Sequence, residues 1–425
     1  MEKYPSVEEG WQGATMALPV PATEGFFCPS DNIRPSEFLS VSIQMNPRIL
    51  MSALLQFAGA LLGALALLTG CVSTPPKAPV PRQAVFYPLP PDAPRIQHLA
   101  TYASARDLET DKAQSGLKDF LLGEEKADEA LVRPYGVAMS DGKIYVTDSR
   151  GPGLAIFDLK SRKFSLVSGS GSGRMQRPIN VSIDTDGTKY VTDTARNQVL
   201  VYDQGDRFLA AYGGKDEFKP VDVAIAGERL YVVDIGHHEV HVLDKRSGKL
   251  RFKFGKSDAD PEKSLHQPTN LAIGRDGDIY VVETGNFRVA RFTPEGKFVR
   301  HYGEAGQAPG QFARPKGIAM DRAGRLYVGD AAFQNVQIFD NGGRILMAFG
   351  QPVDNSPGLN LPAGIAIDYD NVALFRDLAD PKFTIEHLIL VVSQFGPNQV
   401  DVFGFGKMSG TEYPPEDKPE SKPAQ

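Results

Sequence analysis

The 425-residue chain has few cysteines and no excess of positive charge. Its two cysteines, Cys28 and Cys71, both lie near the amino terminus, so the rest of the chain cannot form a disulfide. It contains no Cys-x-x-Cys-His motif, which excludes covalently attached c-type haem. The net charge is −6, whereas proteins that bind nucleic acid or anionic membranes in general are usually basic. We therefore expect no nucleic-acid partner.

What the chain does have is an internal repeat, seen most clearly in residues 314–350. This stretch contains four short runs in which apolar residues occupy every second position, the period of a half-buried strand. Turn residues such as Asp340-Asn-Gly-Gly343 separate the runs. Four strands joined by short turns form an antiparallel sheet, which is stable only when it stacks on similar sheets.

Two markers repeat along the chain. A proline, one variable residue and then Gly, Asn or Asp precede an aliphatic strand six times, about 42 to 48 residues apart: Pro134, Pro178, Pro220, Pro268, Pro315 and Pro362. An acid ends the second strand of the first five repeats: Asp148, Asp193, Asp234, Glu283 and Asp330. A period in the forties with four strands indicates propeller blades. We predict an all-β, six-bladed β-propeller over residues 95–406.

The last repeat is one strand short, and an unpaired alternating run, Arg95 to Tyr102, precedes the first repeat. Placing residues 95–102 as the outer strand of the sixth blade would close the ring and remove an exposed sheet edge. This closure by an amino-terminal strand is part of the predicted fold.

The repeats resemble the NHL family, whose motif combines Pro-x-Gly-aliphatic, Tyr-Val-x-Asp and Asn-x-Arg-Val. The matching residues include Thr284-Gly-Asn-Phe-Arg-Val289 and Thr194-Ala-Arg-Asn-Gln-Val199. The resemblance covers residues 95–406 and is to six-bladed NHL lipoproteins of bacteria. It implies a non-catalytic propeller that binds a protein partner or supports an assembly in the cell envelope.

The amino-terminal region has the pattern of an export signal. Residues 1–44 show no periodicity and precede Met45, which we expect to be the true start. Residues 45–70 then contain one arginine and an apolar run from Ile49 to Leu68. Leu68-Thr-Gly-Cys71 resembles the bacterial lipobox, which implies that Cys71 carries the lipid. The alternative is an uncleaved transmembrane anchor, because an apolar run of about twenty residues can span a bilayer.

Residues 71–94 are rich in proline and are predicted to form an extended tether. Val72, rather than aspartate, follows the cysteine; by resemblance to proteobacterial lipoproteins this implies the outer membrane. Residues 407–425 are proline-rich and charged, and we expect a disordered tail.

The variable position after each marker proline is where a catalytic propeller would place ligands. Peptidylglycine amidating lyase, another NHL propeller, holds zinc there with histidines. This chain has no histidine in those positions, which hold Tyr135, Ile179, Val221, Thr269, Lys316 and Ala363. That activity is therefore not expected.

The next position holds Asn180, Asp222 and Asn270 in three consecutive repeats. Oxygen ligands suit a hard cation such as calcium, and gluconolactonase-type propellers use similar ligands. Together with Tyr135 and Lys316, these residues are candidates for ligand binding at the channel face. The alternative function is thus a hydrolase or lyase that uses a channel metal. The structural alternative is that Asn, Asp and Gly fit the turn that enters the strand.

Two further charged groups have structural explanations. Arg133, Arg177, Lys219, Arg314 and Lys316 could form an anion-binding ring, although we expect them to pair with the second-strand acids of neighbouring blades. His237, His238 and His241 suggest a metal cluster, but their positions in a turn and strand favour solvated side chains.

The sixth repeat departs from the others by an apolar insertion at residues 369–387. It either folds back onto its blade or presents a docking patch for a partner, for which Leu374, Phe375 and Phe383 are the candidates.

Overall fold

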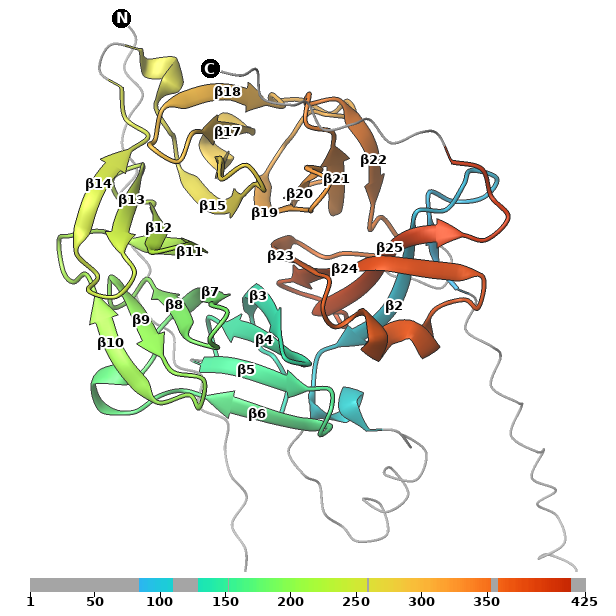
Figure 1. The fold of residues 1–425 in the computed structure, drawn as a ribbon, viewed down its shortest axis with the longest axis horizontal. Helices are drawn as coiled ribbons and strands as arrows, with labels where there is room; N and C mark the ends of the chain where they lie inside the picture. Colours follow the sequence, from blue (N-terminus) through green and yellow to red (C-terminus); the bar gives the residue numbers. More distant parts are fainter. Residues whose placement is uncertain (1–83, 110–128, 152, 258–259, 353–357, 414–425) are drawn as a thin grey trace, which may run out of the picture. The chain divides into compact units, whose positions relative to one another are not determined.

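A computed structural model of the chain describes residues 84–109, 129–151, 153–257, 260–352 and 358–413 (Figure 1). They belong to one compact unit that begins at Pro81. The predicted leader, signal peptide and lipidated Cys71 lie outside the described residues, as does most of the predicted tail. Among the described residues, no helix has the length and apolar character needed to cross a bilayer.

Six antiparallel sheets surround a common axis, which confirms the predicted six-bladed propeller (Figure 1). The strands of blades one to three are β3 Pro134–Ser140, β4 Lys143–Asp148, β5 Gly153–Asp158, β6 Lys163–Val167; β7 Pro178–Ile183, β8 Lys189–Asp193, β9 Gln198–Tyr202, β10 Phe208–Tyr212; β11 Pro220–Ala226, β12 Arg229–Asp234, β13 Glu239–Asp244 and β14 Leu250–Phe254. Those of blades four and five are β15 Pro268–Ile273, β16 Ile279–Glu283, β17 Arg288–Phe292, β18 Phe298–Tyr302; β19 Pro315–Met320, β20 Leu326–Asp330, β21 Asn335–Phe339 and β22 Ile345–Phe349.

Blade six joins the two ends of the repeat region, as predicted. Its strands, from the outside inward, are β1 Phe86–Tyr87, β2 Ile96–Tyr102, β25 Val400–Met408, β24 Phe383–Ser393 and β23 Pro362–Asp368. Strand β2 pairs along its whole length with β25, from Ile96 opposite Phe405 to Tyr102 opposite Val400. Strand β1 was not predicted, because it lies in the proline-rich segment read as tether. Tyr87 is buried there and packs near Phe349 and Phe403.

The hydrophobic core is divided among the gaps between blades. Each of six apolar clusters draws its residues from two neighbouring blades; one, for example, combines Val240 and Val242 of blade three with Val281 of blade four. Consequently both faces of the middle strands are covered by protein. Side chains on either face of a middle strand therefore contact a neighbouring blade and not solvent.

The second-strand acids fasten loops within their own blade, which corrects the expectation that they pair with cations of neighbouring blades. In blade one, Asp148 accepts hydrogen bonds from the backbone N–H groups of Arg133, Arg150 and Gly151. It thereby ties the loop that enters the inner strand to the turn after the second strand. A buried carboxylate is the natural group for this task, because several orphan N–H donors converge on it.

The apolar insertion of blade six folds back onto its own blade. It contains a 3₁₀ helix, η5 Val372–Leu378, in which Phe375 is fully buried; Phe383 at the start of β24 is also buried. Both side chains therefore belong to the core, and of the three predicted docking residues only Leu374 is exposed. The other helical turns are η1 Ala105–Leu108, η2 Gly171–Gly173, η3 Pro261–Lys263 and η4 Thr284–Asn286.

Candidate functional site: the axial cluster

Each inner strand begins at its marker proline, so the residue after the proline lies near one end of the propeller axis. Five of these six residues are partly exposed, whereas Ala363 of blade six is fully buried. The pattern agrees with side chains that line the axis where the inner strands begin. We call Tyr135, Asn180, Asp222, Asn270 and Lys316 the axial cluster.

Lys316 and Tyr135 form the accessible part of the axial cluster. The Lys316 ammonium lies 5.4 Å from the centre of the Tyr135 ring, close enough for a cation–π attraction. These residues come from blades five and one, so their contact spans blade six, whose residue at this position is the small Ala363. Together they place an ammonium group and a phenol at the entry to the axis.

Asn180 is packed between inner strands. Its side-chain Oδ1 accepts a hydrogen bond from the N–H of Val181 at 2.9 Å. A Cβ added to Gly136 of blade one would lie only 2.2 Å from that same oxygen. Glycine is therefore required at position 136 because the Asn180 side chain fills the space.

Asp222 joins blades three and four. Its Oδ1 accepts the N–H of Val223 at 2.7 Å, and its Oδ2 accepts the N–H of Leu271 from the next blade at 2.8 Å. The side chain of Asn270 also hydrogen-bonds to Asp222. Asn270 Oδ1, in contrast, is buried without a hydrogen-bond partner.

Burial shifts the pKa of each ionisable group in the cluster. It raises the pKa of Asp222 to about 7, although the three hydrogen bonds to its carboxyl oppose the change. Burial also lowers the pKa of Lys316 to about 8, and the charges of Arg314 and Arg133 add to this effect. The pKa of Tyr135 is raised by burial and by the charge of Asp222. Such shifts are common at functional sites, though structural networks also produce them.

The predicted channel metal finds few free ligands here. The Oδ1 of Asn180 and both oxygens of Asp222 are engaged by backbone N–H groups, which leaves Asn270 Oδ1 as the unpartnered oxygen of the three. A calcium ion needs six to eight oxygen ligands. The packing therefore matches the structural alternative for these residues better than a preformed calcium site.

Three threonine hydroxyls near the axial cluster also link neighbouring blades; they were not among the predicted site residues. The hydroxyl of Thr147 donates to the carbonyl of Ile179 at 2.6 Å, and that of Thr192 to the carbonyl of Val221 at 3.3 Å. The hydroxyl of Thr284 donates to the carbonyl of Pro315 at 2.6 Å. Each bond links one blade to the next. A Thr one residue before or after the second-strand acid was the available signal.

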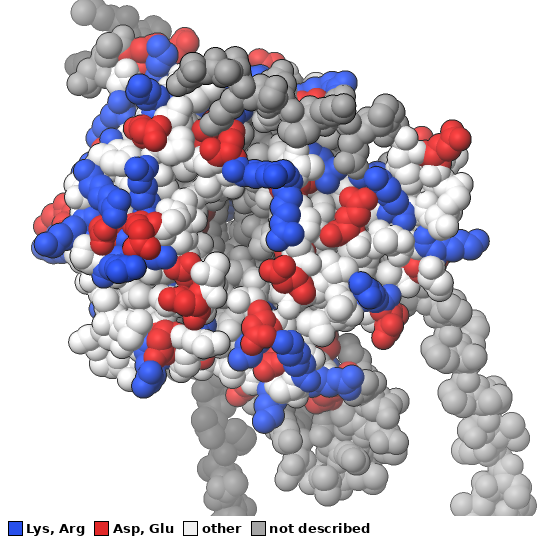
Figure 2. All heavy atoms as spheres, viewed as in Figure 1, with Lys and Arg blue, Asp and Glu red and all other residues white. Residues whose placement is uncertain are grey.

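On the face of the propeller that Figure 2 shows, Lys and Arg side chains lie beside Asp and Glu side chains. Among the cations that precede the marker prolines, Arg133 has an aromatic neighbour. The guanidinium of Arg133 lies 5.0 Å from the ring centre of Phe395.

Of the three histidines predicted to be solvated, His237 is exposed and His238 is partly exposed, whereas His241 is buried. His241 is only 3% exposed and lies 3.0 Å from Glu239 Oε1. The reason is that β13 is a middle strand with both faces covered. His241 therefore points into an interface, where it meets Asp234.

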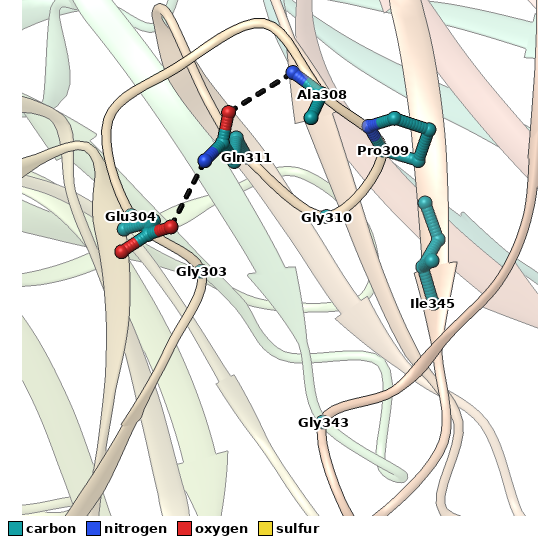
Figure 3. A pocket seen from close by; sticks show the side chains of 8 residues that line it. All are labelled: Gly303, Glu304, Ala308, Pro309, Gly310, Gln311, Gly343 and Ile345. Atoms are coloured by element: carbon teal, nitrogen blue, oxygen red, sulfur yellow. Dashed lines mark hydrogen bonds between the residues drawn. The ribbon is translucent and has the colours of Figure 1, made fainter.

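A shallow hollow of about 360 Å³ lies away from the axis, where the loop before β19 meets the start of β22 (Figure 3). Its polar side chains are already paired: Gln311 donates to Glu304 at 2.9 Å and accepts from the N–H of Ala308 at 3.0 Å. Glycines and Ile345 form much of the remaining lining. The hollow therefore offers little unpaired chemistry to a ligand.

No protein-family model matches the chain. It is 28% identical over 90 residues to a probable peptidyl-α-hydroxyglycine α-amidating lyase of Caenorhabditis elegans, covering 20% of this chain and 26% of that protein. It is 33% identical over 129 residues to the peptidylglycine α-amidating monooxygenase of Rattus norvegicus, covering 28% of this chain and 13% of that protein. The matched region thus spans 26% and 13% of the length of these two relatives.

A solved structure from Bacteroides thetaiotaomicron, of a protein of unknown function, superposes with a TM-score of 0.51. It is 17% identical and covers 65% of this chain and 70% of that chain. At this identity the similarity supports the propeller fold alone.

Proposed function

We propose that the chain is a non-catalytic propeller that binds a protein partner at the entry to its axis. The observation that carries the proposal is the Lys316–Tyr135 contact, which places two hydrogen-bond donors together at a partly exposed position. Their chemistry fits an acidic segment of the partner, since an ammonium and a phenol both donate to carboxylates. The absence of histidine from the positions after the marker prolines and the engaged oxygens of Asn180 and Asp222 favour binding over catalysis.

The proposal includes the cell envelope as the setting. The export signal and the Leu68-Thr-Gly-Cys71 sequence support a lipid anchor at Cys71, and Val72 supports the outer membrane as its destination. The proline-rich residues that follow would hold the propeller off the membrane, where it can meet an envelope protein.

Site-specific photo-cross-linking in intact cells tests the binding site. A photoreactive phenylalanine analogue in place of Tyr135 should yield a discrete adduct with a partner. The matched control places the same analogue at Leu346, which is 45% exposed on the outer strand β22. Lys316→Glu should abolish the adduct by reversing the charge. Equal adducts at both positions, or an adduct that survives Lys316→Glu, would contradict the proposed site.

The second candidate is a hydrolase or lyase with a metal at the axis. Asn270 Oδ1 favours it, because a buried acceptor without a partner is an available metal ligand. The short similarity to amidating lyases points the same way. If this candidate is correct, Asp222→Asn and Asn270→Leu should remove a bound metal that the purified chain otherwise retains, and a hydrolytic or lyase activity should disappear with it.

A further inference from the structure

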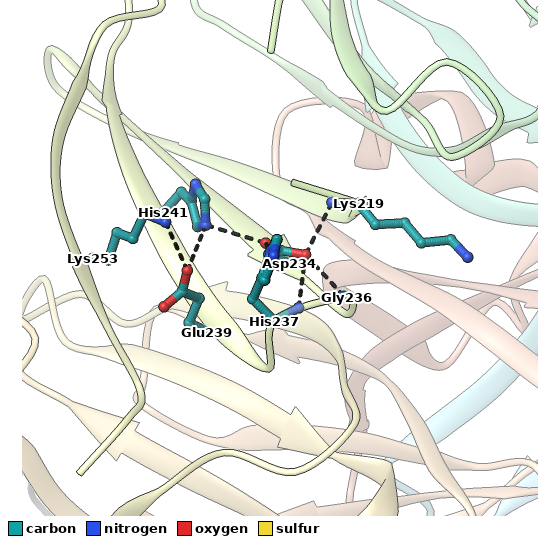
Figure 4. A network of polar contacts seen from close by, with 7 residues as sticks. All are labelled: Lys219, Asp234, Gly236, His237, Glu239, His241 and Lys253. Atoms are coloured by element: carbon teal, nitrogen blue, oxygen red, sulfur yellow. Dashed lines mark hydrogen bonds and ion pairs between the residues drawn. The ribbon is translucent and has the colours of Figure 1, made fainter. Parts of the chain in front are cut away.

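A second cluster of ionisable side chains lies at the loop between β12 and β13 of blade three (Figure 4). It consists of Asp234, His237, Glu239 and His241, and one ligand atom from each lies within 4.8 Å of the others. Asp234 Oδ2 is 2.6 Å from His237 Nδ1 and 3.2 Å from His241 Nε2. His241 Nε2 is also 3.0 Å from Glu239 Oε1.

From this convergence we propose that the four side chains form a transition-metal site of the zinc class. Two imidazole nitrogens and two carboxylate oxygens are a typical donor set for Zn²⁺. The separations between the paired atoms, 2.6 to 3.2 Å, are shorter than the roughly 3.4 Å expected between ligands of a tetrahedral ion with bonds near 2.1 Å, so these side chains would move apart as the ion binds. The ion would occupy the space that the four side chains share.

The hydrogen-bonding of the cluster points to a cation at this place. His241 Nε2 faces two carboxylate oxygens, yet a ring N–H has a single hydrogen and can serve only one of them well. Two carboxylates are thereby held around one nitrogen, an arrangement in which a divalent cation would satisfy both. Within the chain, Glu239 Oε1 also accepts a hydrogen bond from Lys253 at 2.9 Å, and Asp234 Oδ2 lies 2.6 Å from His237 Nδ1.

Blade three differs from its neighbours at each of these positions. In blades one, two and five, the second carboxylate oxygen of the second-strand acid accepts a backbone N–H from the loop before the inner strand; for Asp193 the donors are Gln176 and Arg177. In blade three Asp234 Oδ2 instead faces two imidazoles. Blade two has Arg196, Gln198 and Leu200 where blade three has His237, Glu239 and His241. In blade four, Asn286 and Arg288 occupy the positions of His237 and Glu239 and donate hydrogen bonds to the second-strand acid Glu283, so the pair of imidazoles is what distinguishes blade three.

The protein holds most of the ligands in place. Asp234 Oδ1 accepts backbone N–H groups from Lys219, Gly236 and His237, which leaves Oδ2 directed toward the histidines. The ring of Phe218 packs edge-on against His241 at 5.2 Å. Such supporting contacts orient ligands and raise the affinity of metal sites.

An ion can reach the cluster, because the His237 side chain is 48% exposed while that of Asp234 is fully buried. Lys253 would compete with the metal ion for Glu239, because its ammonium lies 2.9 Å from Glu239 Oε1. Its side chain is 39% exposed, so it can leave Glu239 for solvent when an ion binds.

The test uses the full chain after treatment with a chelator and removal of that chelator. Titration calorimetry with Zn²⁺ should give one equivalent, and Co²⁺ should give the visible absorption of a low-symmetry, four-coordinate site. His237→Ala should weaken Zn²⁺ binding by roughly tenfold or more. His238→Ala is the matched control: this neighbouring histidine packs against His266 instead, so its loss should leave Zn²⁺ binding unchanged. His237 is partly exposed, so its replacement is expected to leave the fold intact.

Two further variants separate this site from its alternatives. Lys253→Met should tighten Zn²⁺ binding because it frees Glu239, and unchanged or weaker binding would contradict the assignment of Glu239 as a ligand. Asp222→Asn should leave the stoichiometry unchanged. The proposal is overturned if the chain binds no Zn²⁺, if His237→Ala binds it as tightly as the parent, or if the ion is lost with Asp222→Asn instead.

Discussion

Two buried aspartates of the same hairpin in blade three, Asp222 on β11 and Asp234 on β12, have opposite electrostatic surroundings. Burial raises the pKa of Asp222 to about 7, because its three hydrogen bonds do not offset the cost of burying the charge. Burial also raises the pKa of Asp234, but hydrogen bonds from His241, the Lys219 N–H and His237 outweigh it, so the pKa lies well below its usual range. The number and charge of the donors, and not burial alone, decide which form is stable.

Asp222 and Asp234 therefore have different roles in blade three. At the axis, Asp222 has a raised pKa and joins blades three and four through a hydrogen bond to a backbone N–H group, without a counter-ion. At the loop between β12 and β13, a permanently ionised carboxylate holds backbone N–H groups and also faces two imidazoles. The first arrangement suits structure, and the second suits an additional cation.

The largest expected effect comes from removing the ionised carboxylate. Asp234→Ala should lower the free energy of unfolding by about 3 kcal/mol, because three backbone N–H groups and the buried His241 lose their acceptor. Denaturant unfolding at neutral pH measures the loss. Asp193→Ala in blade two is the matched control and should cost a similar amount through its backbone bonds. A loss below about 1 kcal/mol for Asp234→Ala would refute its role as the anchor of the loop.

The propeller fold could be predicted from the sequence because the same signals repeat in each blade. The marker prolines, the second-strand acids and the alternating strands occur in nearly every blade, so six weak signals add up to one architecture. The closing strand was found from the count of strands. In contrast, β1 was not predicted, because it is only two residues long and lies in the proline-rich segment.

The sites were harder to predict because they depend on contacts between blades. Asn180 and Asp222 were recognised as polar residues near the axis, but only the structure shows that backbone N–H groups engage their oxygens. His241 was assigned to solvent because strand alternation gives the direction of a side chain and not what lies there. The sequence left open whether Phe375 lies on the surface or in the core; in the structure it is fully buried in the core.

A smaller, pH-dependent effect tests the raised pKa of Asp222. The folded-state pKa of Asp222, about 7, is above its ordinary value of 3.8, so the folded chain binds more protons between these values. Its contribution to stability is therefore present below pH 4 and is lost as the pH rises through 7. Asp222→Asn removes this titration, so the difference in unfolding free energy between variant and parent should shift in favour of the variant as the pH rises from 4 to 8. A difference that is independent of pH would show that the pKa of Asp222 is not raised.

The smallest effect on stability is expected at Lys316, the group that the proposed partner would contact. Burial and the nearby arginines lower its pKa to about 8 from 10.5, so the unfolded chain binds more protons between these values and stability should rise over that interval. Lys316→Met should abolish the rise and, at neutral pH, leave the fold unchanged or slightly more stable, because a partly buried charge is removed while the apolar stem remains. Unfolding curves at pH 7 and pH 10 measure both effects. Cross-linking from position 135 should in turn weaken above pH 8 in the parent chain, since the ammonium that attracts an acidic segment is lost there; an adduct yield that is constant to pH 10 would mean that the charge of Lys316 has no part in recognition.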